Sequence, residues 1–326
     1  MLLVIVSGMV LIVLSADYFT NGVEWMGRAL GLRASAVGTL LAALGTALPE
    51  TLVPVMAMVF GGGGAAAVGL GAILGAPFML ATLGFVILGG SVAWWRRRDA
   101  RAEADAHAVT RDLSFFLAVF AAALVAAVLP AAVRPFWAGA LVLAYAAFAR
   151  SVLLTGRDGT PPQDAPSAPL RLWQTSPPPV TVVVFQVVTA LVGLVVGAHY
   201  FVTALEDWAR VSGWSGFLLS VVLTPVATEL PEVLNSVIWI RRRADTLAFG
   251  NVTGALAFQS SLVPALGIWF TPWRFLPLEW VVGVLALGAA LFIYLSVARR
   301  GLRPVQLMGA GAFYALFVGV ALAGVR

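Results

Sequence analysis

Long apolar runs follow one another along this chain, and only short polar stretches separate them. A helix of about 18 or more such residues is long enough to cross the hydrocarbon core of a bilayer, which is roughly 30 Å thick. The chain is 61% hydrophobic and 11% charged, and no long polar stretch is left for a soluble domain. The sequence therefore predicts an all-α polytopic membrane protein.

Ten membrane-spanning helices are expected. They cover residues 2–27, 34–60, 65–93, 113–130, 135–154, 180–209, 214–240, 246–270, 277–298 and 304–324. The first and sixth are long enough to cross the bilayer at a tilt. The first apolar run has no basic segment before it and no clear cleavage site, so we expect a membrane span there and not a signal peptide.

The basic residues predict the orientation in the membrane. All 20 are arginines. If the N-terminus is outside, 16 of them fall in cytoplasmic loops and the other 4 on the outer side. Cytoplasmic loops of membrane proteins carry such an excess. Both termini are therefore expected outside, in the cell membrane, and the net charge of +5 gives no reason to expect nucleic-acid binding. Cysteine is absent, which excludes disulfides and thiolate metal sites.

An internal repeat divides the chain. Residues 17–50 and 199–232 share ten identities over 34 positions without a gap. Five spans precede the second copy, an odd number, so the two halves must cross the membrane in opposite senses. Inverted repeats of this kind are typical of secondary transporters, which bind ions near the midplane where the repeats meet. We expect a first repeat over 1–154, a cytoplasmic linker over 155–179 and a second repeat over 180–326.

Each repeat carries a glutamate inside an apolar run. Gly45–Glu50 reads GTALPE, and Ala227–Glu232 reads ATELPE. A charged side chain at membrane depth costs ~3 kcal/mol or more and usually marks an ion path or site. The proline beside each glutamate removes a backbone donor, so carbonyls of the preceding turn become free to face a cation. A buried kink explains one copy as well as an ion site does, but it is a poor explanation for two related by symmetry.

The two motifs together provide hard oxygen ligands. Thr46 lies four residues before Glu50, and Thr228 four residues before Glu232, so each pair shares a helix face. Inverted halves would bring the two carboxylates together. Carboxylate, hydroxyl and carbonyl oxygens suit Ca²⁺, Na⁺ or Mg²⁺. Two close carboxylates repel when empty, so such a site can exchange a divalent cation for protons or Na⁺.

These motifs resemble the G-T-S-L-P-E signature of the cation/Ca²⁺ exchanger superfamily, whose best-known members are the Na⁺/Ca²⁺ exchangers. The resemblance covers nearly the whole chain. It implies ten helices in two inverted five-helix repeats, and cation-ligand roles for Glu50 and Glu232 with Thr46 and Thr228 beside them. It also implies secondary antiport of Ca²⁺, or a similar divalent cation, for Na⁺ or H⁺, without a cofactor.

The chain departs from this family at several ligand positions. A second signature, roughly G-N-x-x-G-S-N-x-x-[N/D], persists as Gly250–Gln259 but has decayed in Gly71–Leu80. The serines beside the glutamates become Ala47 and Glu229. Glu229 can replace a missing ligand, carry a proton, or face a water-filled vestibule. Gln259 is expected in the site, or otherwise bridges helices by hydrogen bonds.

A second polar face lies on the first helix. Asp17, Asn21 and Glu24 share it, and their repeat mates include His199 and Glu206. We consider two explanations, an access path for ions and, preferred, the wet end of a tilted helix.

Two alternatives to an exchanger remain. An intramembrane enzyme acting on a lipid phosphate would need an arginine and a base near the glutamates, and no arginine lies mid-span there. The chain is therefore not expected to be an enzyme. A transporter fold without exchange activity is supported by the decayed second signature. The expected partners are inorganic cations and the lipid bilayer, with no nucleic acid and no obligate protein partner.

Overall fold

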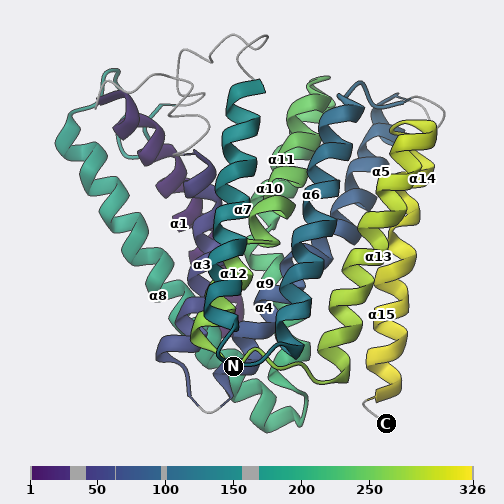
Figure 1. Cartoon of the computed structure of the whole chain (residues 1–326). Coiled ribbons are helices and arrows are strands. Elements are labelled where there is room, and N and C mark those ends of the chain that lie inside the picture. Colours follow the sequence, from purple (N-terminus) through teal and green to yellow (C-terminus); the bar gives the residue numbers. More distant parts are fainter. Residues whose placement is uncertain (1, 30–41, 63, 97–100, 156–168, 325–326) are drawn as a thin grey trace.

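The computed structural model describes residues 2–29, 42–62, 64–96, 101–155 and 169–324. Over these residues the chain is a bundle of helices that lie side by side (Figure 1), which confirms the all-α prediction. The helices are α1 (Leu2–Ala29), α3 (Ala42–Phe60), α4 (Ala65–Met79), the π-helix η2 (Leu80–Gly84), α5 (Phe85–Arg96), α6 (Ala106–Val125), the 3-10 helix η3 (Ala126–Val128), α7 (Arg134–Thr155), α8 (Val180–Ser212), α9 (Gly216–Thr228), α10 (Leu230–Arg241), α11 (Asp245–Gln259), α12 (Leu262–Phe270), α13 (Pro277–Arg300), α14 (Pro304–Gly309) and α15 (Gly311–Gly324).

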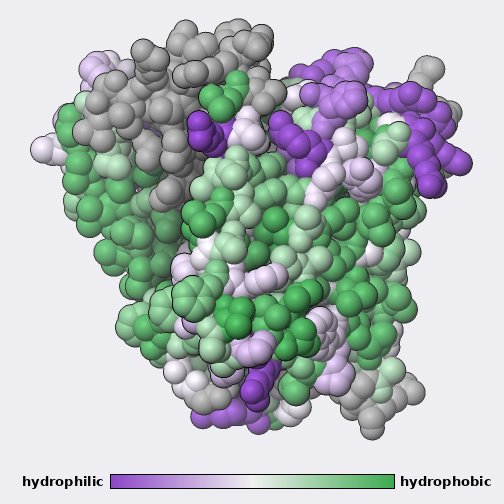
Figure 2. Space-filling model, viewed as in Figure 1, coloured by the Kyte–Doolittle hydropathy of each residue, from purple (hydrophilic) through white to green (hydrophobic). Residues whose placement is uncertain are grey.

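The described helices account for most of the predicted spans. Eight segments are long and apolar enough to cross a membrane, and the bent pair α9–α10 adds a ninth. The second predicted span, 34–60, is described only from residue 42 onward, as α3, so the count of ten is not confirmed. Apolar residues cover the middle of the face seen in Figure 2, and hydrophilic residues gather toward its two ends, as expected for a bundle embedded in lipid.

The first helices of the two halves, α1 and α8, pack along each other at one edge of the bundle (Figure 1). Gly8 of α1 lies against Phe201, and Gly22 lies against Val187, so the two helices run antiparallel. A Cβ atom at Gly193 would come within 2.3 Å of the Ser15 hydroxyl oxygen. Glycine therefore permits the close approach, and the antiparallel packing is what halves of opposite sense require.

A second pair of helices joins the halves at the centre of the bundle. Helix α4 of the first half is buried from Val68 to Met79 and packs against α9 of the second half. A Cβ atom at Gly71 would come within 2.6 Å of the Phe217 carbonyl oxygen, and one at Gly75 within 2.9 Å of the Val221 carbonyl oxygen. The small residues of α4 thus bring the backbone of α9 close, and α9 leads directly into the second glutamate motif.

Helix α11 is anchored at its start by a buried ion pair. Asp245, in the first turn of α11, binds Arg96 at the end of α5, and both side chains are almost fully buried. The backbone N–H of Glu103 donates to the same carboxylate at 2.8 Å. Pairing a buried carboxylate with a guanidinium and an additional donor compensates for its lost hydration. The contact fixes the start of the helix that ends at Gln259.

The polar face of α1 binds a turn of the linker. We call residues 169–173 the linker turn. Asn21 donates to the Pro169 carbonyl oxygen at 3.2 Å and accepts the Arg171 N–H at 3.0 Å, and the Arg171 guanidinium pairs with Asp17. Gln186 of α8, fully buried, donates to the Asn21 amide oxygen at 3.0 Å. In the structure Asp17 and Asn21 contact the linker turn, and Asn21 also contacts α8, so this part of the polar face is used in packing between α1, the linker turn and α8.

Candidate cation site

Breaks in the helices place the glutamates of the second half. Helix α9 ends at Thr228, α10 begins at Leu230, and the two are bent by 47°. Glu229 lies at this break, and its backbone N–H still donates to the Pro225 carbonyl oxygen at 2.8 Å. Proline at position 231 has no N–H to continue the hydrogen-bond ladder, which weakens the helix at this point.

The first-half motif is locally different. Pro49 lies inside α3, which continues from Ala42 to Phe60. Glu50 therefore projects from an unbroken helix, whereas Glu229 and Glu232 project from the bend between α9 and α10.

Three carboxylates meet between these elements. One carboxylate oxygen from each of Glu50, Glu229 and Glu232 lies within 4.8 Å of the other two. The three residues are 5%, 0% and 3% exposed. The four ion pairs found among the described residues all involve other carboxylates. A buried charge without a partner is strongly unfavourable, so a cluster of three calls for a cation from outside the chain.

The hydrogen bonds within the cluster are unequal. Glu229 accepts the Thr228 hydroxyl at 3.0 Å on one oxygen and the Gln259 amide N–H at 2.8 Å on the other. By contrast, one buried oxygen of Glu50, one of Glu232 and the amide oxygen of Gln259 have no hydrogen-bond partner among the described residues. Leaving a buried acceptor unpaired costs about 1–3 kcal/mol. Carboxylate and amide oxygens are the ligands that hard cations such as Ca²⁺ take.

The structure thus brings together five of the six residues selected from the sequence. The carboxylates of Glu50, Glu229 and Glu232 form the cluster, and Thr228 and Gln259 are hydrogen-bonded to Glu229. The side chain of the sixth, Thr46, lies outside the described residues. Their roles as ligands remain predictions.

Gln259 reaches the cluster because α11 ends there. The hydroxyls of Ser260 and Ser261 both donate to the Ala257 carbonyl oxygen, at 2.9 and 2.7 Å, and α12 starts one residue later. Leu80, which occupies the matching position of the first half, is fully buried at the start of the π-helix η2. The first half therefore contributes no polar side-chain atom from this position.

Two side chains that the sequence did not single out as site residues hydrogen-bond the backbone of Glu232. Ser236 donates to the Glu232 carbonyl oxygen at 2.8 Å, and Asn251 donates to the same oxygen at 3.0 Å. Ser236 follows Glu232 by four residues and so shares its helix face, a signal present in the sequence. Both residues steady the first turn of α10, which carries Glu232.

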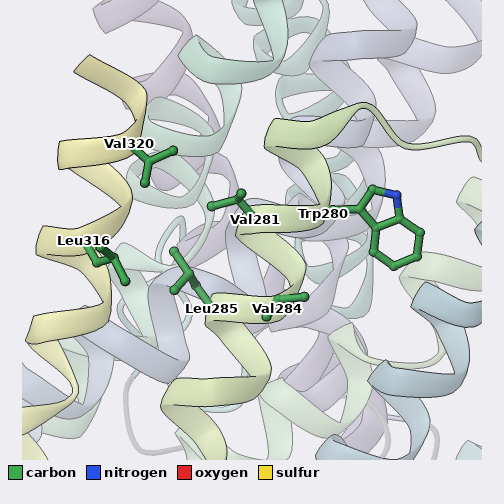
Figure 3. Close-up of a pocket in the computed structure, with 6 residues that line it drawn as sticks. All are labelled: Trp280, Val281, Val284, Leu285, Leu316 and Val320. Atoms are coloured by element: carbon green, nitrogen blue, oxygen red, sulfur yellow. The ribbon is translucent and has the colours of Figure 1, made fainter. Parts of the chain in front are cut away.

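An apolar groove elsewhere takes no part in the site. It has a volume of about 370 Å³, lies between α13 and α15, and is lined by Trp280, Val281, Val284, Leu285, Leu316 and Val320 (Figure 3). None of these side chains can bind a cation through oxygen, and no residue of the carboxylate cluster lines the groove.

A bundle of apolar helices with antiparallel leading helices and a buried carboxylate cluster at a helix break defines a secondary cation transporter. The chain belongs to the sodium/calcium exchanger protein family, whose model matches residues 1–154 and 182–324. No curated protein matches the sequence of this chain.

Solved structures share this fold. The crystal structure of the H⁺/Ca²⁺ exchanger CAX aligns with a TM-score of 0.73 at 16% identity, covering 98% of this chain and 81% of the other. Native YfkE aligns with a TM-score of 0.67 at 16% identity, covering 98% and 99%. The sodium-calcium exchanger NCX_Mj aligns with a TM-score of 0.59 at 20% identity, covering 98% and 99%. Family and site identify a cation antiporter and favour neither an enzyme nor a fold without exchange activity.

Proposed function

We propose that this protein exchanges Ca²⁺, or a divalent cation of similar size, for Na⁺ or H⁺ across the cell membrane. Glu50, Glu229 and Glu232 would form the shared site, with Gln259 contributing its amide oxygen. The observation that carries the proposal is the cluster itself, in which three buried carboxylates lie within 4.8 Å of one another without a basic partner among the described residues.

The ligand set favours a divalent cation of the size of Ca²⁺. The three carboxylates and the amide present only hard oxygen atoms, the ligand type that Ca²⁺ takes in sets of 6–8 and in flexible geometry. Mg²⁺ demands a near-ideal octahedron and gives up its waters reluctantly. The cluster is irregular, since one member comes from an unbroken helix and two come from a bend. An irregular set of carboxylates suits the more tolerant ion.

Exchange follows from competition at one site. The carboxylates that bind a divalent cation also attract Na⁺ or protons, so the two substrates displace each other. Halves of opposite sense allow the shared site to open alternately to each side. The relatives support both coupling ions, since CAX is an H⁺/Ca²⁺ exchanger and NCX_Mj a sodium-calcium exchanger.

The same proposal includes an orientation. Helix α1 begins, and α15 ends, at one end of the bundle, while α5 and α10 end, and α6 and α11 begin, at the other (Figure 1). The second end carries the exposed arginines 241–243. With 16 of 20 arginines expected on one side, the positive-inside rule would put that end in the cytoplasm and both termini outside.

The test is Ca²⁺ flux in proteoliposomes. Vesicles containing the purified protein should take up Ca²⁺ when an opposing Na⁺ or H⁺ gradient is imposed, and running the two gradients separately identifies the coupling ion. Glu50→Gln and Glu232→Gln should abolish uptake, whereas Glu103→Gln, an exposed carboxylate outside the site, should not. Absence of divalent-cation flux under both gradients would refute the proposed function.

A further inference from the structure

Glu229 differs from the other two glutamates of the cluster in how its oxygens are used. Both of its oxygens already accept a hydrogen bond from a neutral donor, the Thr228 hydroxyl and the Gln259 amide. Glu50 and Glu232 each keep one buried oxygen without a partner among the described residues. The unpaired oxygens are free to turn toward an ion, whereas those of Glu229 would first have to give up hydrogen bonds.

The two donors come from positions that the fold holds firmly. Thr228 is the last residue of α9 and is 1% exposed, and Gln259 is the last residue of α11 and is 2% exposed. Helix α11 is anchored at its other end by the ion pair of Asp245 with Arg96. Glu229 is therefore held between the ends of two helices that are themselves packed in the core.

Neutral donors hold the carboxylate without cancelling its charge. A guanidinium partner would bring a positive charge to Glu229, whereas a hydroxyl and an amide donate hydrogen bonds without adding any charge to this buried site. The attraction between a fixed charge and an ion is proportional to the charge of the ion. A divalent cation in the cluster therefore gains twice the electrostatic free energy from Glu229 that a monovalent cation gains.

The first half has no residues that match Glu229 and Gln259 in chemistry. Ala47 occupies the position that matches Glu229, and Leu80 occupies the one that matches Gln259. The third charge and its amide donor thus occur once, on one side of the site.

We propose that Glu229, held by Thr228 and Gln259, is a fixed charge that sets the preference for divalent over monovalent cations, while Glu50 and Glu232 provide the mobile ligand oxygens. Thr228 and Gln259 are then positioning residues for selectivity. This inference rests on the proposed function, because it assigns a division of roles within the same cation site.

The test compares selectivity and not activity alone. Equilibrium binding of radioactive Ca²⁺ to the purified protein gives the Ca²⁺ affinity, and displacement by Na⁺ gives the Na⁺ affinity. Glu229→Gln should weaken Ca²⁺ binding far more than Na⁺ binding, lowering the ratio of the two affinities by about tenfold or more. Thr228→Val and Gln259→Met, which remove one donor each, should lower the ratio in the same direction by a smaller factor.

Matched variants separate positioning from packing. Thr228→Ser keeps the hydroxyl and should retain the wild-type ratio, whereas Thr228→Val keeps the shape and should not. In the Thr228→Val/Glu229→Gln double variant the ratio should fall no further than in Glu229→Gln alone, because the donor acts through Glu229. If Glu229→Gln fails to fold, the two Thr228 variants still decide the question.

Two outcomes have different meanings. If the wild-type protein carries no divalent cation, the proposed function fails and the inference fails with it. If the wild-type protein transports Ca²⁺ but Glu229→Gln or Thr228→Val weakens Ca²⁺ and Na⁺ binding equally, only the inference is overturned, and Glu229 is an ordinary ligand.

Discussion

Neutralising Glu50 should make the cation-free protein more stable while removing its response to Ca²⁺. Glu50 is buried, and one of its oxygens lies within 4.8 Å of an oxygen of both Glu229 and Glu232. At that separation two unit charges repel by about 3 kcal/mol with an effective dielectric constant of about 20. Uptake of protons by the empty cluster relieves part of this repulsion. We therefore expect Glu50→Gln to raise the free energy of unfolding by about 1–3 kcal/mol in the absence of cations.

The response to Ca²⁺ should change in the opposite direction. A ligand present at 100 times its Kd stabilises the folded state by about 2.7 kcal/mol. The wild-type protein should gain this stabilisation from Ca²⁺, and Glu50→Gln should gain little, because it loses a ligand and a charge. At low pH the stability difference between the two proteins should narrow. Protonation then removes negative charge from the wild-type cluster, as the uncharged amide does in the variant.

Thermal unfolding of the detergent-solubilised protein measures both effects, with a chelator in one series and millimolar Ca²⁺ in the other. Glu103→Gln, which removes an exposed carboxylate, should match the wild-type protein in both series. The reasoning fails if Glu50→Gln unfolds at a lower temperature than the wild-type protein in chelator. It also fails if Ca²⁺ raises the unfolding temperature of the variant as much as that of the wild-type protein.

Three further predictions concern the frame around the site. Asp245→Asn should lower the free energy of unfolding by about 3–5 kcal/mol, because its buried partner Arg96 loses its counter-charge. Asp207→Asn, in an exposed pair, should change it by less than about 1 kcal/mol. Equal unfolding temperatures of the two variants would disprove this. Gly193→Ala should destabilise the protein by about 1–3 kcal/mol, since the added Cβ meets a side-chain oxygen of α1, and Gly139→Ala, in open space, should not. Asn21→Leu should release the linker turn and increase protease cleavage within 169–173; an unchanged digestion pattern would count against that contact.

The sequence was informative about class and symmetry because both depend on local patterns. Apolar runs of membrane length predicted the helices, and the repeat predicted that Glu50 and Glu232 belong to opposite-facing halves. Glu229 lies three residues before Glu232, a spacing that puts two side chains on nearly the same helix face, so its place in the site could be expected. The break between α9 and α10 at Glu229 and the hydrogen bond from Gln259 could not be predicted, because both depend on tertiary packing.

The contacts and the backbone around the site could not be predicted from sequence patterns either. Nothing in the spacing of Asp17 and Asn21 indicates that a turn 148 residues away in sequence would fold back onto them. The continuous helix through Pro49 was also unexpected, since the same Pro-Glu motif breaks the helix in the second half. Two motifs that share Leu-Pro-Glu thus have different backbones, so the proline alone does not determine where the helix breaks.

The linker turn has a consequence for how the two halves find each other. It is covalently part of the segment that leads into α8, yet it is hydrogen-bonded to Asn21 and paired with Asp17, both on α1. A chain cut between Thr155 and Pro169 would leave this turn on the second fragment, with its partners Asp17 and Asn21 on the first. The contacts of the turn with Asp17 and Asn21 would then join the two fragments, in addition to the packing of α1 against α8.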